Sequence, residues 1–156
     1  MRPLIGSVDG DAFTAGVFGL AVERATATLP QTTNAPIFTI SGGRVVAFAI
    51  LGEVTVALQV LLNSTKLTAV PTVGSAVDIC AVVDVSGLEV GGKLLAPNVA
   101  ATALCKTNAG AAFGAYGFTM LAPGTLNLNC AASATGSVKW TMFYCGFDPG
   151  AAVVAA

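Results

Sequence analysis

Residues 123–149 read PGTLNLNCAASATGSVKWTMFYCGFDP and carry the clearest strand signal in the chain. Apolar side chains occupy every second position, namely Leu126, Leu128 and Cys130 in the first half and Val138, Trp140, Met142 and Tyr144 in the second. A period of two predicts β-strands with one apolar face. Because small and polar residues separate the two halves, we expect a β-hairpin here, with Trp140 buried in the core.

The second of these strands is apolar on both faces toward its end. Phe143, Cys145 and Phe147 lie on the face opposite to Trp140. A strand of this kind is expected where a second sheet covers one face and another layer or a second subunit covers the other.

Further short apolar runs, separated by Gly, Pro, Asn and Ser, begin at Ile37. They span residues 37–40, 44–58, 66–70, 73–85, 93–95, 100–106 and 115–121. We expect the first two to form a hairpin, and Gly52 to mark a bulge or bend. About eight to ten short antiparallel strands predict an all-β domain, a jelly-roll-like sandwich or barrel.

Residues 1–35 lack this regular pattern and predict an extended N-terminal arm before a β-sandwich domain at residues 36–156. Two interpretations are open. The segment either reaches a neighbouring subunit or forms the first strand pair of the same domain. A short helix at residues 17–26 is disfavoured by Thr and Gly.

Charge is scarce in this chain of 156 residues: 10 % of the residues are charged and 54 % are apolar. Globular domains usually carry about 25 % charged residues, so we expect apolar surface to be buried between subunits, most simply in a homotrimer. The net charge of -1 has no clustered run, which disfavours nucleic acid and anionic membranes as partners.

The mean hydropathy of +0.79 requires a test for a membrane span. The best window, residues 45–62, has Glu53 near its centre, and β-branched residues dominate its first half. The first residues contain no apolar run of signal-peptide length before Asp9. We therefore expect neither a membrane span nor an export signal.

Catalytic and cofactor signals are weak. The chain has no His, which removes Ser-His-Asp and Cys-His arrangements. Glu53 lies in an apolar run and could act as an acid, but a solvent-facing position or a pair with Arg44 or a Lys across the sheet is favoured. Asp9 and Asp11 resemble the start of a calcium loop whose other ligands do not follow. We predict a protein that is not an enzyme and holds no cofactor or metal.

The four cysteines, Cys80, Cys105, Cys130 and Cys145, are separated by 25, 25 and 15 residues. These separations do not fit a zinc site, so buried thiols are favoured and a disulfide remains the alternative. Phe113, Tyr116 and Phe118 could form an aromatic platform for a sugar, although packing on the core or in an interface is favoured.

Five segments together resemble small structural proteins of tailed bacteriophages and prophages. They are LPQTTNAPIFTISGGRV (29–45), GEVT (52–55), KLTAVPTVG (66–74), VDIC (77–80) and GSVKWTMFY (136–144). The resemblance runs from residue 29 to the C-terminus. It implies a capsid decoration (cement) protein, an all-β trimer bound to the major capsid protein. Such a protein is made in the host cytoplasm and resides on the virion surface.

The interface residues expected on this basis are Phe13, Phe18, Leu20, Phe113, Tyr116, Phe143 and Phe147. The alternative function is a receptor- or glycan-binding β-domain of a phage tail fibre or spike.

Overall fold

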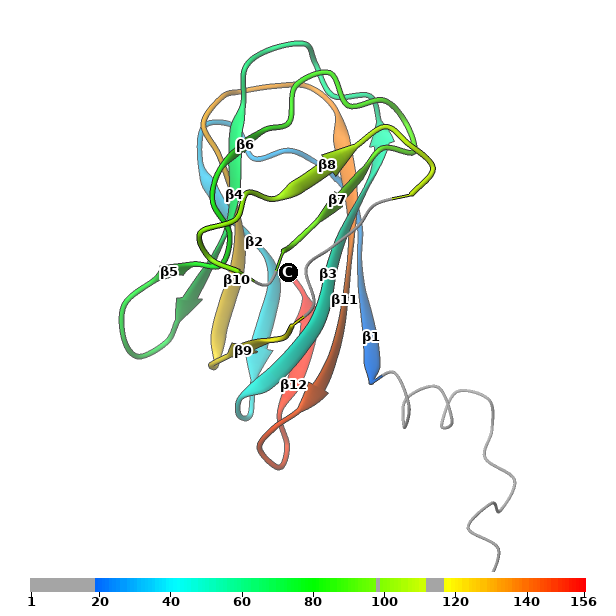
Figure 1. Cartoon of the computed structure of the whole chain (residues 1–156). Coiled ribbons are helices and arrows are strands. Elements are labelled where there is room, and N and C mark those ends of the chain that lie inside the picture. The colour runs from blue at the N-terminus through cyan, green and yellow to red at the C-terminus, as the bar shows by residue number, and fades with distance from the viewer. Residues whose placement is uncertain (1–18, 98, 112–116) are drawn as a thin grey trace, which may run out of the picture.

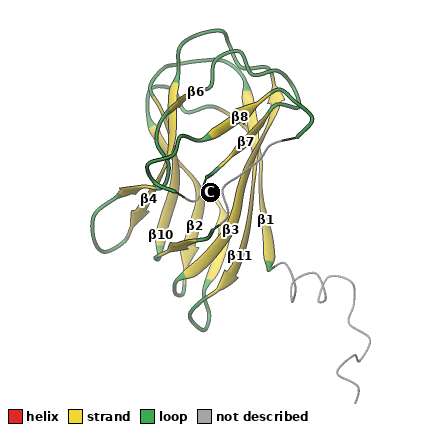
Figure 2. Ribbon diagram, in the orientation of Figure 1, coloured by secondary structure: helices red, strands yellow, loops and turns green. Residues whose placement is uncertain are grey.

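The fold is a β-sandwich of two antiparallel sheets. A computed structural model describes residues 19–97, 99–111 and 117–156 (Figures 1 and 2). It assigns twelve strands to these residues, several of them only two or three residues long. None of the described residues is helical, and no helix there could span a membrane. The predicted all-β sandwich is confirmed.

The first sheet, sheet A, is built on a long central pair. Its strands run in the order β1 (Leu20–Thr28), β11 (Ser137–Gly146), β3 (Val45–Val56), β7 (Lys93–Leu95) and β8 (Cys105–Thr107). Strand β9 (Thr119–Leu121) also pairs with β3, on the side away from β11 and beside its first residues.

The second sheet, sheet B, faces the first. Its order is β12 (Ala152–Ala155), β2 (Asn34–Ser41), β10 (Gly124–Cys130), β4 (Ser64–Pro71) and β5 (Val77–Asp78), and β6 (Val83–Asp84) also pairs with β4.

The predicted hairpin at residues 123–149 is wrong. Strand β10 lies between β2 and β4, whereas β11 lies between β1 and β3 in the other sheet. The intervening residues 131–136 cross from one sheet to the other, so the two apolar faces meet across the sandwich, where sheets pack about 10 Å apart. The hairpin predicted from residues 37–58 is wrong in the same way, since β2 and β3 lie in different sheets.

Part of the predicted N-terminal arm belongs to the sandwich. Residues 20–28 are strand β1, in which Leu20 lies opposite Tyr144 and Thr28 opposite Ser137. Val22 packs on the core from this strand. For these residues, the alternative of strands on the same domain is the one observed, and deleting residues 1–28 would remove an edge strand of sheet A. The rest of the arm up to residue 18 lies outside the described residues.

Trp140 is at the centre of the core, with 1 % of its surface exposed, as predicted. Its neighbour in the register is Gly52 of β3. A Cβ atom at position 52 would lie 3.1 Å from two carbons of the Trp140 ring and 3.1 Å from Cβ of Leu94. Gly52 therefore makes room for the indole. It does not mark a bulge, because the register of β3 and β11 shifts elsewhere, in one case between Ala47 and Ala49.

The close contact of Gly52 with Trp140 yields a stability prediction. Gly52→Ala should lower the free energy of unfolding by about 1–3 kcal/mol, because overpacked cores lose stability in this range. The loss should be smaller in a Trp140→Phe background, where the contacting ring is absent. Urea denaturation of the four chains of this cycle measures the coupling. Gly110→Ala is the control, since a Cβ there meets nothing within 4 Å. Equal losses in both backgrounds would contradict the packing role.

A charged clamp joins the two turns at one end of the sandwich, β2–β3 and β11–β12. The Asp148 carboxylate accepts hydrogen bonds from the backbone N, Nε and Nη2 of Arg44, each 2.8 Å long. The guanidinium also stacks 4.6 Å from the ring centre of Phe147. The hydrogen bonds from Arg44 lower the pKa of Asp148 to about 2.

The clamp predicts acid sensitivity in a defined window. An unfolded aspartate has a pKa of about 4. Because folding lowers the pKa of Asp148, the clamp stabilises the fold fully above about pH 4. The stabilisation is lost as the pH falls toward the folded-state pKa of about 2. Asp148→Asn should lower the melting temperature at neutral pH and flatten its decline in acid. An unchanged decline in the variant would show that other groups control acid unfolding.

Candidate functional site

The candidate site lies on the outer face of sheet A. Side chains of β11 alternate between buried and partly exposed positions along the strand. Trp140 and Met142 point into the core, so Lys139, Thr141 and Phe143 point outward. The strand pattern that builds the core therefore also places charged, hydroxyl and aromatic groups on one external surface.

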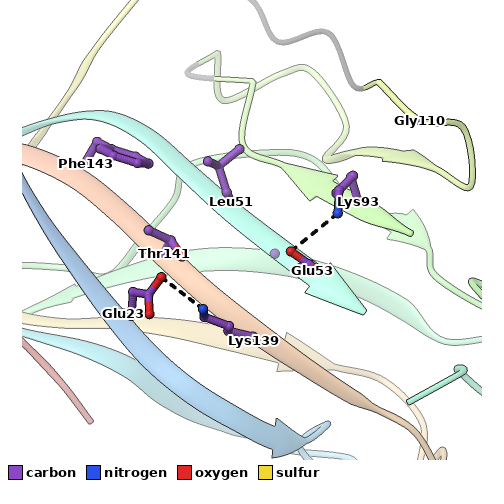
Figure 3. Close-up of a pocket in the computed structure, with 9 residues that line it drawn as sticks. Glu23, Leu51, Glu53, Lys93, Gly110, Lys139, Thr141 and Phe143 are labelled. Carbon is purple, nitrogen blue, oxygen red and sulfur yellow. Dashed lines mark ion pairs between the residues drawn. The ribbon is translucent and has the colours of Figure 1, made fainter. Parts of the chain in front are cut away.

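Four charged side chains alternate in sign across this surface, and we call them the charge row. They are Glu23 on β1, Lys139 on β11, Glu53 on β3 and Lys93 on β7. Lys139 Nζ lies 3.0 Å from Oε1 of Glu23, and Lys93 Nζ lies 3.4 Å from Oε2 of Glu53 (Figure 3). Glu53 stands opposite both lysines in the strand register.

The charge row borders an open pocket of about 390 Å³. Leu51, Thr141 and Phe143 continue its lining along β3 and β11, and Gly110 lines it from beyond β8 (Figure 3). The pocket lining thus combines the ring of Phe143, the methyl groups of Leu51, the hydroxyl of Thr141 and the four charged groups of the charge row. Such a mixture can bind a polar ligand or the polar part of a protein surface.

Glu53 is the acid that the sequence singled out, and the geometry favours its ion-pair interpretation. Its side chain is 56 % exposed and is paired with Lys93. Exposed ion pairs of this type contribute about 0–1 kcal/mol to stability. The charge row therefore contributes little to the stability of the fold, and its side chains are available to bind a ligand or a partner.

Carboxylates with lowered pKa values hold turns and strand ends. Backbone hydrogen bonding from Asn63, followed by hydrogen bonds from Ser86, lowers the pKa of Asp84 to about 2. Hydrogen bonds from Lys66 and Thr68 lower the pKa of Asp78, and Lys66 Nζ lies 2.6 Å from its Oδ2. These groups tie loops to sheet B and have structural roles.

The cysteines are free thiols in the described chain. Cys80 and Cys130 are buried, as predicted, and burial raises the pKa of each thiol. Cys105 and Cys145 are half-buried. No group of three or more metal-ligating side chains occurs among the residues that the structure describes. Asp9 and Asp11 lie outside them.

The predicted interface residues do not form one patch where the structure describes them. Leu20 shares the inner side of sheet A with its partner Tyr144, whereas Phe143 faces outward into the pocket. Phe147 lies beyond β11 and packs under Arg44. The remaining four, Phe13, Phe18, Phe113 and Tyr116, lie outside the described residues.

Sequence patterns did not identify the charge row, because its members come from four strands and are far apart in the chain. They also did not identify the exposed apolar side chains around β5 and β9, including Val77 and Met120. Only the strand pairing places these residues together. No local spacing signal could have found either group.

Comparison with known proteins adds no assignment, since no family model, no curated protein and no solved structure matches this chain.

Proposed function

We propose that this chain is a non-enzymatic structural protein of a bacteriophage virion, a decoration protein that binds the major capsid protein as a homotrimer. Binding only to the assembled lattice would stabilise the capsid by mass action. The proposal rests on the sequence resemblance and on the surface described next. The protein would be made in the host cytoplasm and reside on the capsid surface.

The observation that carries this proposal is the exposed apolar surface of a chain with little charge. Phe118 is 62 % exposed and Leu62 is 71 % exposed, and Val60, Leu61 and Leu62 form a consecutive exposed run. Monomeric soluble proteins seldom expose contiguous apolar patches larger than a few hundred Å², and larger patches often mark contacts with other proteins. A subunit of a large assembly is the class of protein that such a surface fits.

The strand order supports the jelly-roll form of the sandwich. Successive strands alternate between the sheets from β1 to β4 and again from β9 to β12. As a result β11 inserts between β1 and β3, and β10 inserts between β2 and β4 (Figure 1). Jelly rolls combine two Greek keys in this interleaved way and are common in viral capsid proteins and lectins.

The pocket on sheet A favours a second candidate, glycan binding by a tail fibre or spike domain. Phe143 offers a ring face, and Thr141 and the charge row offer hydrogen-bonding groups beside it. Aromatic rings with nearby polar groups are suited to bind sugars. If the chain binds glycans, the unaltered chain should be retained on a glycan surface, and Phe143→Ala should abolish this retention. If it binds only the capsid, the unaltered chain should not be retained.

The number of copies per particle tests the proposal. Quantitative mass spectrometry of purified particles, made by the phage or prophage that encodes this chain, compares it with the major capsid protein. We expect a copy number of the same order as that of the major capsid protein. A few copies per particle would favour the tail candidate. Complete absence from particles would overturn both virion roles.

A further inference from the structure

An apolar groove opens at one edge of the sandwich, between the β4–β5 hairpin of sheet B and strand β9 of sheet A. Two cavities of about 270 Å³ each share Val77, Ile79, Thr119 and Met120, so they adjoin. Val77 is 58 % exposed and Met120 is 46 % exposed. We call this feature the edge groove.

The edge groove reaches down to the core. Ile40, Ile79 and Leu121 line it and are themselves buried, while Val70 and Pro71 line it from β4. Phe118 extends the apolar surface at its mouth. Here the described residues cover the space between the two sheets only in part. An apolar, extended segment of chain has the shape and chemistry to fill it.

The edge groove lies on the opposite side of the sandwich from the start of β1. Strand β1 is the outermost strand of sheet A on one side, and β9 lies beyond β11 and β3 on the other. In sheet B, β12 is outermost on the β1 side and β5 on the groove side (Figure 1). Copies set side by side in the same orientation would therefore bring the β1 edge of one to the groove of the next.

We propose that residues 1–18 of one copy bind in the edge groove of a neighbouring copy. This segment enters β1 through Gly19 and contains three charged residues, Arg2, Asp9 and Asp11. Its larger apolar residues are Leu4, Ile5, Val8, Phe13, Val17 and Phe18. They match a groove whose lining is mainly aliphatic.

The segment is long enough to reach either groove, but the path to the groove of a neighbour set side by side is the shorter one. Extended chain spans about 3.3 Å per residue, so Phe13 can lie up to about 20 Å from Gly19. To reach its own groove, the segment would first cross about 14 Å of sheet A, the width of three strand spacings, and then turn round the edge. In copies set side by side, the groove of the adjacent copy would lie next to the β1 edge, and no such crossing would be needed.

The contact joins unlike surfaces, the N-terminal segment of one copy and the groove of the next. Contacts of this kind repeat head to tail and close into a ring when the rotation between copies allows it. Closure after three copies would produce the proposed homotrimer. The contact itself does not depend on a capsid, so it and the virion role can fail separately.

Photo-crosslinking of the full-length chain tests this contact. Phe13 is replaced by p-benzoylphenylalanine, whose excited ketone inserts into nearby C–H bonds and reacts readily with methionine. Normal and heavy-isotope chains are unfolded, mixed, refolded together and irradiated, and the crosslinked peptides are sequenced by mass spectrometry. We expect heavy-to-light crosslinks from position 13 to the peptides that contain Met120 or Val77. Crosslinks within one chain only, crosslinks to other surfaces, or none at all would overturn the proposal.

A matched pair of variants locates the contact within the same photoreactive chain. Val77→Asp places a carboxylate in the groove and should lower the yield of inter-chain crosslink about tenfold, since an unpaired charge is costly in an apolar site. Val90→Asp makes the same change at a residue that is 68 % exposed in the turn before β7 and should leave the yield unchanged. This turn hydrogen-bonds to Val54, at the end of β3 away from β9. Equal yields from both variants would overturn the proposal. If Val77→Asp does not fold by circular dichroism, Met120→Lys replaces it with the same expected loss.

Discussion

The structure depends on the way two consecutive strands, β10 and β11, become central strands of opposite sheets. Leu126 and Leu128 project from one, and Trp140 and Met142 project from the other, all into the space between the sheets. Because each strand has neighbours on both sides, its apolar face is surrounded by the other core residues. Gly52 completes this arrangement by leaving space for the indole of Trp140.

The same constraint determines the outside of the molecule. A strand whose inner positions are fixed by the core must direct the alternate positions outward, and on β11 these are Lys139, Thr141 and Phe143. The charge row, the pocket and the exposed aromatic ring are therefore consequences of how the core is built. At the groove edge the short strands β5 and β9 leave apolar side chains exposed among the described residues, and the proposed contact between copies would cover them.

Sequence patterns predicted which faces are buried, and Trp140 and the other alternating residues of β10 and β11 are buried as expected. They did not predict which strands pair. Alternation is a property of one strand, whereas pairing depends on the path of loops such as residues 131–136. The strand at residues 20–28 was difficult to predict for a related reason. This edge strand mixes Ala, Thr and charged residues, so its apolar side chains show only a weak period of two. The charge row and the edge groove depend on pairing between distant strands and could not be predicted.

We propose that this chain is a subunit whose exposed apolar surface is covered by other copies and by a larger assembly. The most direct measurement is the solution mass of the full-length protein by sedimentation equilibrium at micromolar concentration. We expect the mass of a trimer, with dissociation to smaller species on dilution. A monomer mass over the whole concentration range would contradict it.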